Sequence, residues 1–90
     1  MKITVKINKT FTEGKIRAIA TATFEDCYAV HGIKLIDGDK GRFMAMPSER
    51  WENKDGEVKY QDVFHPIHAD ARKALENEVF AAYEAFTAQQ

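Results

Sequence analysis

Apolar and polar residues alternate at the start of the chain, and this pattern recurs through its first three-quarters. Ile3, Val5 and Ile7 alternate with polar residues, which predicts a strand with one buried face. Four further extended segments, rich in Ile, Val, Thr and aromatic residues, are predicted over residues 15–24, 27–36, 42–46 and 60–64. The connections between the segments are too short for parallel crossovers, so we expect antiparallel pairing.

Turn-forming residues separate the predicted strands. Residues 37–41 (DGDKG) are a strong hairpin signal before the fourth strand, and Pro47 stops that strand. Strand pairing is expected to end near Pro66, because proline cannot donate a backbone hydrogen bond. Residues 48–59 are polar and rich in charge, which indicates either a mobile excursion or a long hairpin tip.

From about residue 69 to residue 88 the apolar period becomes that of a helix. One helical stripe is apolar and contains Leu75, Val79, Ala82, Tyr83 and Phe86. Asp70 is the expected N-cap. The sequence therefore predicts an α+β fold, in which an antiparallel sheet of four to five strands precedes one long C-terminal helix. Residues 1–90 are expected to form a single domain that is strand-rich over residues 1–66.

The length of the chain bears on its assembly. Ninety residues suit one domain but bury only a thin core. One helix covers one face of a sheet and leaves strand edges open, and Phe80 lies off the apolar stripe of that helix. These features favour a homodimer. The expected interface residues are Phe80, Met44 and Met46; the two methionines share a strand face and are placed in the core or in the dimer seam.

The distribution of apolar residues and cysteine indicates a compartment. No segment approaches the ~20 consecutive apolar residues of a membrane-spanning helix, and the alternating N-terminus lacks the apolar centre of a signal peptide. The single cysteine, Cys27, cannot form an internal disulfide, which agrees with a reducing compartment. We therefore expect a cytoplasmic protein with no membrane partner.

Two pairs of potential zinc ligands occur in the chain. Cys27 and His31 are four residues apart, and His65 and His68 are three apart. Positions four apart on a strand are about 13 Å from each other, too far to share an ion whose ligand atoms lie ~2.0–2.3 Å away. No glycine-rich phosphate loop or nucleophile elbow is present. We expect no metal, no cofactor and no catalytic residue.

Charge along the chain is uneven, although the net charge of −1 argues against a strongly basic nucleic-acid binder. Lysine and arginine outnumber carboxylates five to one in residues 1–24. Two neighbouring strand faces are expected to combine cations with hydroxyl groups: Lys2, Thr4 and Lys6 on one, and Lys15, Arg17, Thr21 and Thr23 on the next. Such donors suit phosphate oxygens, and an ordinary solvated sheet face would have the same pattern.

Several short motifs follow one another in an order that resembles a known family. They are RAIA at residues 17–20, IDG at 36–38, GRF at 41–43, AMPS at 45–48, DGE at 55–57 and HPI at 65–67. With these motifs the chain resembles the stage V sporulation protein G (SpoVG) family over nearly its whole length. It departs from the family pattern at Glu49, where the family usually has lysine.

The resemblance implies a small bacterial cytosolic protein that dimerises through its sheet and has no catalytic activity. It implies a regulator that binds DNA or RNA weakly, with little sequence specificity, and acts in sporulation and in restraint of septum formation. The cations expected to contact nucleic acid are Lys15, Arg17, Arg42 and Arg50, with Lys2, Lys6 and Arg72 as lesser candidates. The alternative is a protein-interaction module of the cell-division machinery without a nucleic-acid ligand.

Overall fold

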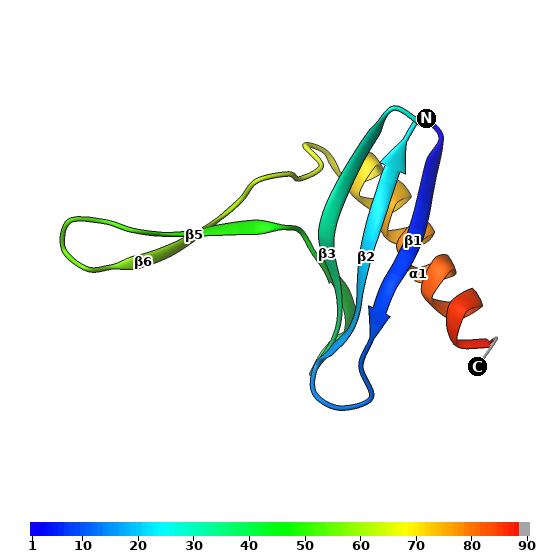
Figure 1. Cartoon of the computed structure of the whole chain (residues 1–90), viewed down its shortest axis with the longest axis horizontal. Coiled ribbons are helices and arrows are strands. Elements are labelled where there is room, and N and C mark those ends of the chain that lie inside the picture. Colours follow the sequence, from blue (N-terminus) through cyan, green and yellow to red (C-terminus); the bar gives the residue numbers. More distant parts are fainter. Residues whose placement is uncertain (89–90) are drawn as a thin grey trace.

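The computed structural model describes residues 1–88 and contains a four-stranded sheet with one helix packed against it (Figure 1). The strands are β1 (Ile3–Thr10), β2 (Ile16–Phe24), β3 (Tyr28–Gly38) and β4 (Gly41–Ala45), and they lie in the sheet in that order. Each strand pairs antiparallel with the next one along the chain. The four strands predicted from alternation and turn residues are confirmed.

A second, two-stranded sheet projects from the body of the molecule, and we call residues 48–62 the arm (Figure 1). It consists of β5 (Ser48–Glu52) and β6 (Val58–Asp62), and all ten strand residues are exposed. At its base the Val63 N–H donates to the Pro47 carbonyl at 2.9 Å. The fifth predicted strand therefore exists but pairs with β5 rather than with the larger sheet. Of the two interpretations of residues 48–59, the hairpin is correct.

One side chain organises the tip of the arm. The Asn53 Oδ1 accepts the N–H groups of Asp55 and Glu57 at 3.0 and 2.9 Å. The Asn53 N–H donates to the Glu57 carbonyl at 3.0 Å, and Gly56 adopts a φ of 81°, which glycine takes without steric cost. The hydrogen bonds of the Asn53 side chain thus stabilise an exposed turn that has little side-chain packing.

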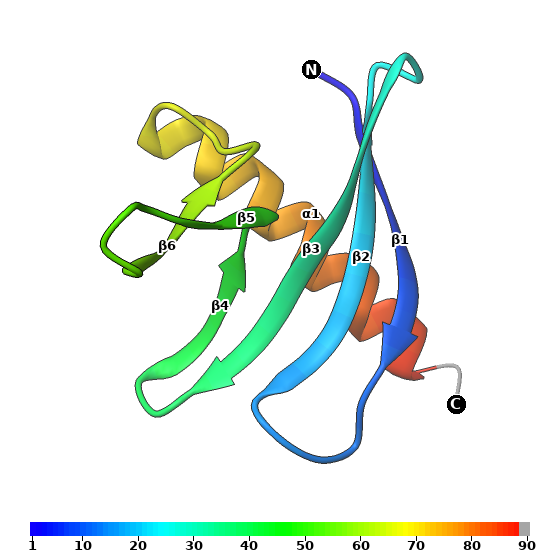
Figure 2. The same cartoon turned by 60° about the vertical axis from the view of Figure 1, so that its left-hand side comes forward.

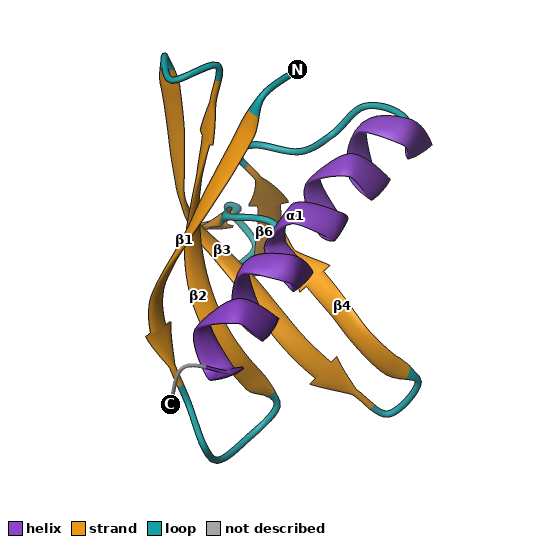
Figure 3. Cartoon of the chain, turned by 90° about the vertical axis from the view of Figure 1, so that its right-hand side faces the viewer, coloured by secondary structure: helices purple, strands orange, loops and turns teal. Residues whose placement is uncertain are grey.

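The helix α1 (Ala69–Ala88) crosses one face of the four-stranded sheet (Figure 3). Its apolar stripe is confirmed, because Leu75, Val79 and Tyr83 are buried. The predicted N-cap is wrong, because the helix begins two residues earlier than an Asp70 cap would allow. The cap is His68, whose Nδ1 accepts the Ala71 N–H at 3.1 Å. Asp70 lies in the first turn, where its negative charge is favourable to the helix dipole.

The core lies between the helix and the sheet. Three alanines on one face of β2 are almost completely buried, and their small size allows the helix to lie close to the sheet. The largest fully buried side chains around them are Ile33, Leu35, Met44 and Val79. The helix covers one face of the sheet, and the opposite face is turned to solvent (Figure 2).

The arm makes the molecule more extended than its length requires. Its radius of gyration is 14.3 Å, whereas a compact domain of this length has a radius of about 12 Å. The arm and the helix lie on opposite sides of the four-stranded sheet (Figures 1 and 3). Within residues 1–88, no helix is long and apolar enough to cross a membrane.

Candidate nucleic-acid interface

The face of the four-stranded sheet opposite the helix is not covered by another element of the sheet or by the helix, and we call it the open face (Figure 2). In each strand its residues alternate with buried ones; Lys34, for example, lies between the buried Ile33 and Leu35. The strand register, with its irregularities, places on it Thr4, Lys6, Asn8, Lys9, Ile16, Ile19, Thr21, Thr23, His31, Lys34, Ile36 and Phe43.

The open face carries three lysines and, within residues 1–88, no strand carboxylate. Lys9, Ile19 and Lys34 are consecutive partners across β1, β2 and β3, so two ammonium groups flank one apolar residue. Lys6 pairs with Thr21 in a neighbouring row. None of these lysines has an ion-pair partner among the described residues. Cations that keep their charge, with hydroxyl donors beside them, suit phosphate oxygens.

A chain of three polar side chains crosses the open face from β1 to β3. The Thr21 hydroxyl donates to the Asn8 Oδ1 at 2.7 Å and lies 3.0 Å from the His31 Nδ1. Because the single hydroxyl hydrogen is given to Asn8, His31 must donate through its Nδ1–H to the Thr21 oxygen. The Nε2 of His31 is then the ring atom left to accept a hydrogen bond.

Arg17 does not lie on the open face, where alternation placed it together with Thr21 and Thr23. The register between β2 and β3 shifts between Ile16 and Ala18, and this bulge gives Arg17 no direct partner. A bulge turns two successive residues toward the same side of the sheet. Arg17 is thereby directed to Asp37, with its Nε 3.5 Å from the Asp37 Oδ2.

Asp37 joins Arg17 and Arg42 into one charged cluster. The Arg42 Nε donates to the Asp37 Oδ1 at 2.9 Å, and the Arg42 guanidinium lies over the Tyr83 ring, 5.0 Å from its centroid. The hydrogen bond from Arg42 is the main cause that lowers the pKa of Asp37 below its ordinary value, and the positive charges of Arg42 and Arg17 add to it. The same bond raises the pKa of Arg42.

Three other predicted cations also have carboxylate partners within the chain. Lys15 lies 3.8 Å from Asp39, and Lys2 lies 2.7 Å from Asp26. Arg72 lies 3.2 Å from Glu76 and donates to the Met44 carbonyl. Arg50 is exposed on the arm opposite Tyr60, without an ion-pair partner among the described residues. The structure therefore brings Lys15, Arg17 and Arg42 together around Asp37 and Asp39, and places Arg50 apart from them on the arm.

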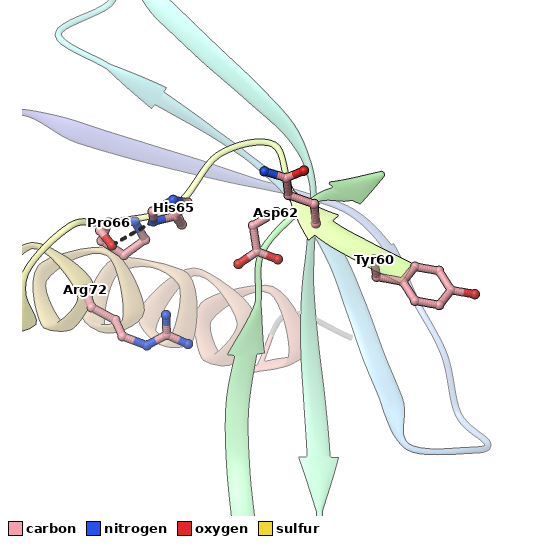
Figure 4. Close-up of a pocket in the computed structure, with 6 residues that line it drawn as sticks. Tyr60, Asp62, His65, Pro66 and Arg72 are labelled. Atoms are coloured by element: carbon pink, nitrogen blue, oxygen red, sulfur yellow. Dashed lines mark hydrogen bonds between the residues drawn. The ribbon is translucent and has the colours of Figure 1, made fainter. Parts of the chain in front are cut away.

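An open cavity of about 470 Å³ lies between the base of the arm and the start of the helix. It is lined by Tyr60, Gln61, Asp62, His65, Pro66 and Arg72. The Asp62 carboxylate and the Arg72 guanidinium extend into this space (Figure 4). His65 bonds to the Pro66 carbonyl at 3.2 Å. Within residues 1–88 no group of three His, Cys, Asp or Glu side chains is placed to hold a metal ion.

Known proteins similar to this chain identify its family. A family model described as SpoVG matches residues 1–85. The chain belongs to the SpoVG family. Relatives named "Putative septation protein SpoVG" include that of Alkaliphilus metalliredigens, 44% identical over 84 residues (92% of this chain and 82% of the relative). That of Clostridioides difficile is 45% identical over 84 residues (92% and 87%), and that of Lachnospira eligens 46% over 85 residues (93% and 92%). The family resemblance inferred from the motifs is confirmed.

In this member of the SpoVG family, the residues expected at a dimer interface are mostly used within the chain. Met44 and Met46 are buried in the core beneath the helix. Phe80 is partly buried and packs against the same core. The surface that these three positions offer to a second copy is therefore the exposed part of Phe80.

Two lysines of the open face were not identified from the sequence of this SpoVG-family chain. Lys34 could have been found, because it alternates with the apolar Ile33 and Leu35 on a predicted strand. Lys9 could not, because the register of β1 shifts between Ile7 and Lys9 and moves it to the other face. Nothing in the sequence marks that irregularity.

Proposed function

We propose that the protein is a cytoplasmic regulator of septation and sporulation that binds nucleic acid through the open face of its sheet. The observation that carries this proposal is the separation of charge, since Lys6, Lys9 and Lys34 face solvent on a surface without strand carboxylates. The names of the relatives support the septation role. Contacts to phosphate carry no sequence information, so low sequence specificity is expected.

The proposal changes the relative weight of the cations named from the sequence. Lys6 remains a contact, and Arg50 is a second one from the arm. Lys15, Arg17, Arg42, Lys2 and Arg72 contribute less, because each already has a carboxylate partner within the chain. These ion pairs partly neutralise the positive charge of the five side chains in the protein without ligand.

Fluorescence anisotropy over a range of salt concentrations tests the proposal. A labelled 20-base-pair DNA should bind at low salt, and its affinity should fall steeply with ionic strength. The variant Lys6→Gln/Lys9→Gln/Lys34→Gln should bind weakly, and its slope of log affinity against log salt should be lower by roughly two to three units.

A variant with the same change in charge elsewhere is the matched control. Lys54→Gln/Lys59→Gln/Lys73→Gln removes three exposed lysines from the arm and the helix. It should keep the parent affinity and the parent salt slope. Equal losses in the two triple variants would show that binding depends on total charge and not on the open face.

The alternative function is that of a protein-interaction module of the division machinery. The observation that favours it is the arm, on which Trp51, Val58 and Tyr60 are exposed. Aromatic residues are enriched at protein interfaces. This alternative predicts no binding of nucleic acid at low salt, so the same anisotropy series separates the two functions.

A further inference from the structure

The strand β1 forms an edge of the four-stranded sheet, on the side away from the arm (Figures 1 and 2). Among the described residues it pairs with β2 alone. The Glu25 N–H donates to the Lys2 carbonyl at 2.8 Å, so these two cross-strand neighbours form a hydrogen-bonded pair. Along an antiparallel ladder such pairs alternate with pairs that are not hydrogen-bonded. The N–H and C=O groups of Ile3, Val5 and Ile7 therefore point away from β2, along the open edge.

The side chains of β1 differ between the two sides of this edge. Ile3, Val5 and Ile7 face the helix and belong to the core or pack against it. Lys6 and Lys9 lie on the open face without an ion-pair partner among the described residues, and β1 itself contains no carboxylate. Residues that lie opposite each other in neighbouring strands share a face. A strand added at this edge would therefore have apolar neighbours on the helix side and lysines on the open face.

A small apolar pocket of about 90 Å³ lies beside the start of β1. It is lined from the sheet by Ile3 and Phe24, from the segment before the helix by Phe64 and Pro66, and from the helix by Leu75. The centroids of the Phe24 and Phe64 rings are 5.5 Å apart. All residues around the pocket are apolar, so it suits one aliphatic side chain. A residue opposite Ile3 on an added strand would be next to this pocket.

A second copy of the chain is a poor occupant of this edge. Pairing β1 with the β1 of another copy would bring the lysines of both copies onto one strand pair, and like charges on neighbouring strands are destabilising. Lysine on an edge strand is a common means of preventing such pairing. The same lysines attract carboxylates, so charge favours a partner strand with acidic residues.

We propose that the edge of β1 binds an extended segment of a partner protein in which apolar and acidic residues alternate. The segment adds to the sheet antiparallel to β1, and its backbone bonds to Ile3, Val5 and Ile7. Its acidic residues lie beside Lys6 and Lys9, and one of its apolar residues enters the pocket. Backbone hydrogen bonds supply affinity in this mode of recognition, and contacts of alternate side chains supply specificity. The inference goes beyond the proposed nucleic-acid function and does not depend on it.

Fluorescence anisotropy with a labelled heptapeptide of alternating valine and glutamate tests the inference. The protein should bind this peptide and should not bind its counterpart with lysine in place of glutamate. In antiparallel pairing the valines lie opposite Ile3, Val5 and Ile7 and exchange backbone hydrogen bonds with them. N-methylation of the valines should therefore weaken binding by about tenfold or more. N-methylation of the glutamates, whose N–H groups point away from β1, is the matched control and should leave binding unchanged.

Hydrogen exchange followed by NMR locates the added strand. The amides of Ile3, Val5 and Ile7 have no partner in β2 and should become protected when the peptide is added. The amides of Thr4 and Lys6 bond to β2 already, so their protection should not change.

Two variants of the helix test the pocket. Ala71 lines the pocket, so Ala71→Met fills part of it and should weaken peptide binding by about fourfold, the equivalent of one buried CH₂ group. Ala74→Met, at an exposed position of the same helix, is the control and should bind as the parent does.

Four results would overturn the inference. They are equal binding of the two N-methylated peptides, an unchanged affinity in Ala71→Met, no new protection of the three edge amides, and no binding of the valine–glutamate peptide at millimolar concentration. Each of them leaves the proposed function standing, because that function is tested with oligonucleotides. Loss of oligonucleotide binding would likewise leave the peptide result unaffected.

Discussion

Asp37 determines which arginines of this protein are available to a partner. It is the one carboxylate in the four strands of the main sheet, and Arg17 and Arg42 both turn toward it. The three side chains are partly exposed, although the Arg17 Nε itself is buried and makes no hydrogen bond within the described residues. The number and spacing of lysines and arginines in a sequence therefore overestimate the positive charge of a surface, because some of these side chains are paired with carboxylates in the fold.

The depressed pKa of Asp37 predicts a pH-dependent contribution to stability. A carboxylate whose pKa is lower in the folded state stabilises the fold above its unfolded pKa, near the ordinary value of 3.8. That contribution is lost as the pH falls through the folded pKa. Asp37→Asn should therefore be less stable than the parent in urea unfolding at pH 7, and the two should converge near pH 2.

The control for this prediction is Asp39→Asn. Asp39 lies 3.8 Å from Lys15, and its side chain is 93% exposed, so its loss should change stability little at either pH. A deficit of Asp37→Asn that persists undiminished at pH 2 would show that the ion pairs are not its cause.

At the scale of elements, the helix depends on an unusual cap. Histidine at the N-cap accepts a backbone N–H only through an unprotonated ring nitrogen, and His68 does so toward Ala71. His68→Ala should lower the free energy of unfolding by about 1 kcal/mol. Thermal unfolding should show a melting temperature lower by about 5 °C.

A substitution that keeps an acceptor provides the comparison. His68→Ser offers a hydroxyl oxygen to the same N–H and should retain the parent stability or exceed it. If serine and alanine were equally destabilising, the hydrogen bond would not be what His68 contributes.

The arm is the element with the weakest support from the rest of the chain. A two-stranded hairpin alone is at best marginally stable in water, and every strand residue of this one is exposed. In hydrogen exchange, the amides of β5 and β6 should exchange far faster than those of Ile33 and Leu35 in the core of the sheet. Equal protection of the two regions would mean that another surface covers the arm in solution.

Elements were easier to predict than the irregularities within them. The alternation of Ile3, Val5 and Ile7 and the helical stripe around Val79 report burial on one side, and both were correct. The bulges that turn Arg17 and Lys9 depend on cross-strand register, which no local pattern contains. The sequence of the arm fits two interpretations for a related reason, because strands without a buried face have no alternation to detect.

At the scale of the whole molecule, the open strand edges, the thin core and the exposed arm still favour two copies. Light scattering coupled to size exclusion should give about twice the chain mass of 10.3 kDa. The measured mass should stay at the dimer value when the protein is diluted through the micromolar range. A clean monomer there would contradict the dimer, and it would leave the open face of a single chain to account for binding.

The closed base of the arm has a consequence for how such proteins diverge. Because the hydrogen bond between Val63 and Pro47 brings the two ends of the arm together, its length is independent of the sheet before it and the helix after it. Insertions or deletions in matched pairs would lengthen or shorten the hairpin without shifting any core contact. Evolution can therefore vary the reach of this appendage, and what it meets, while the rest of the fold stays constant.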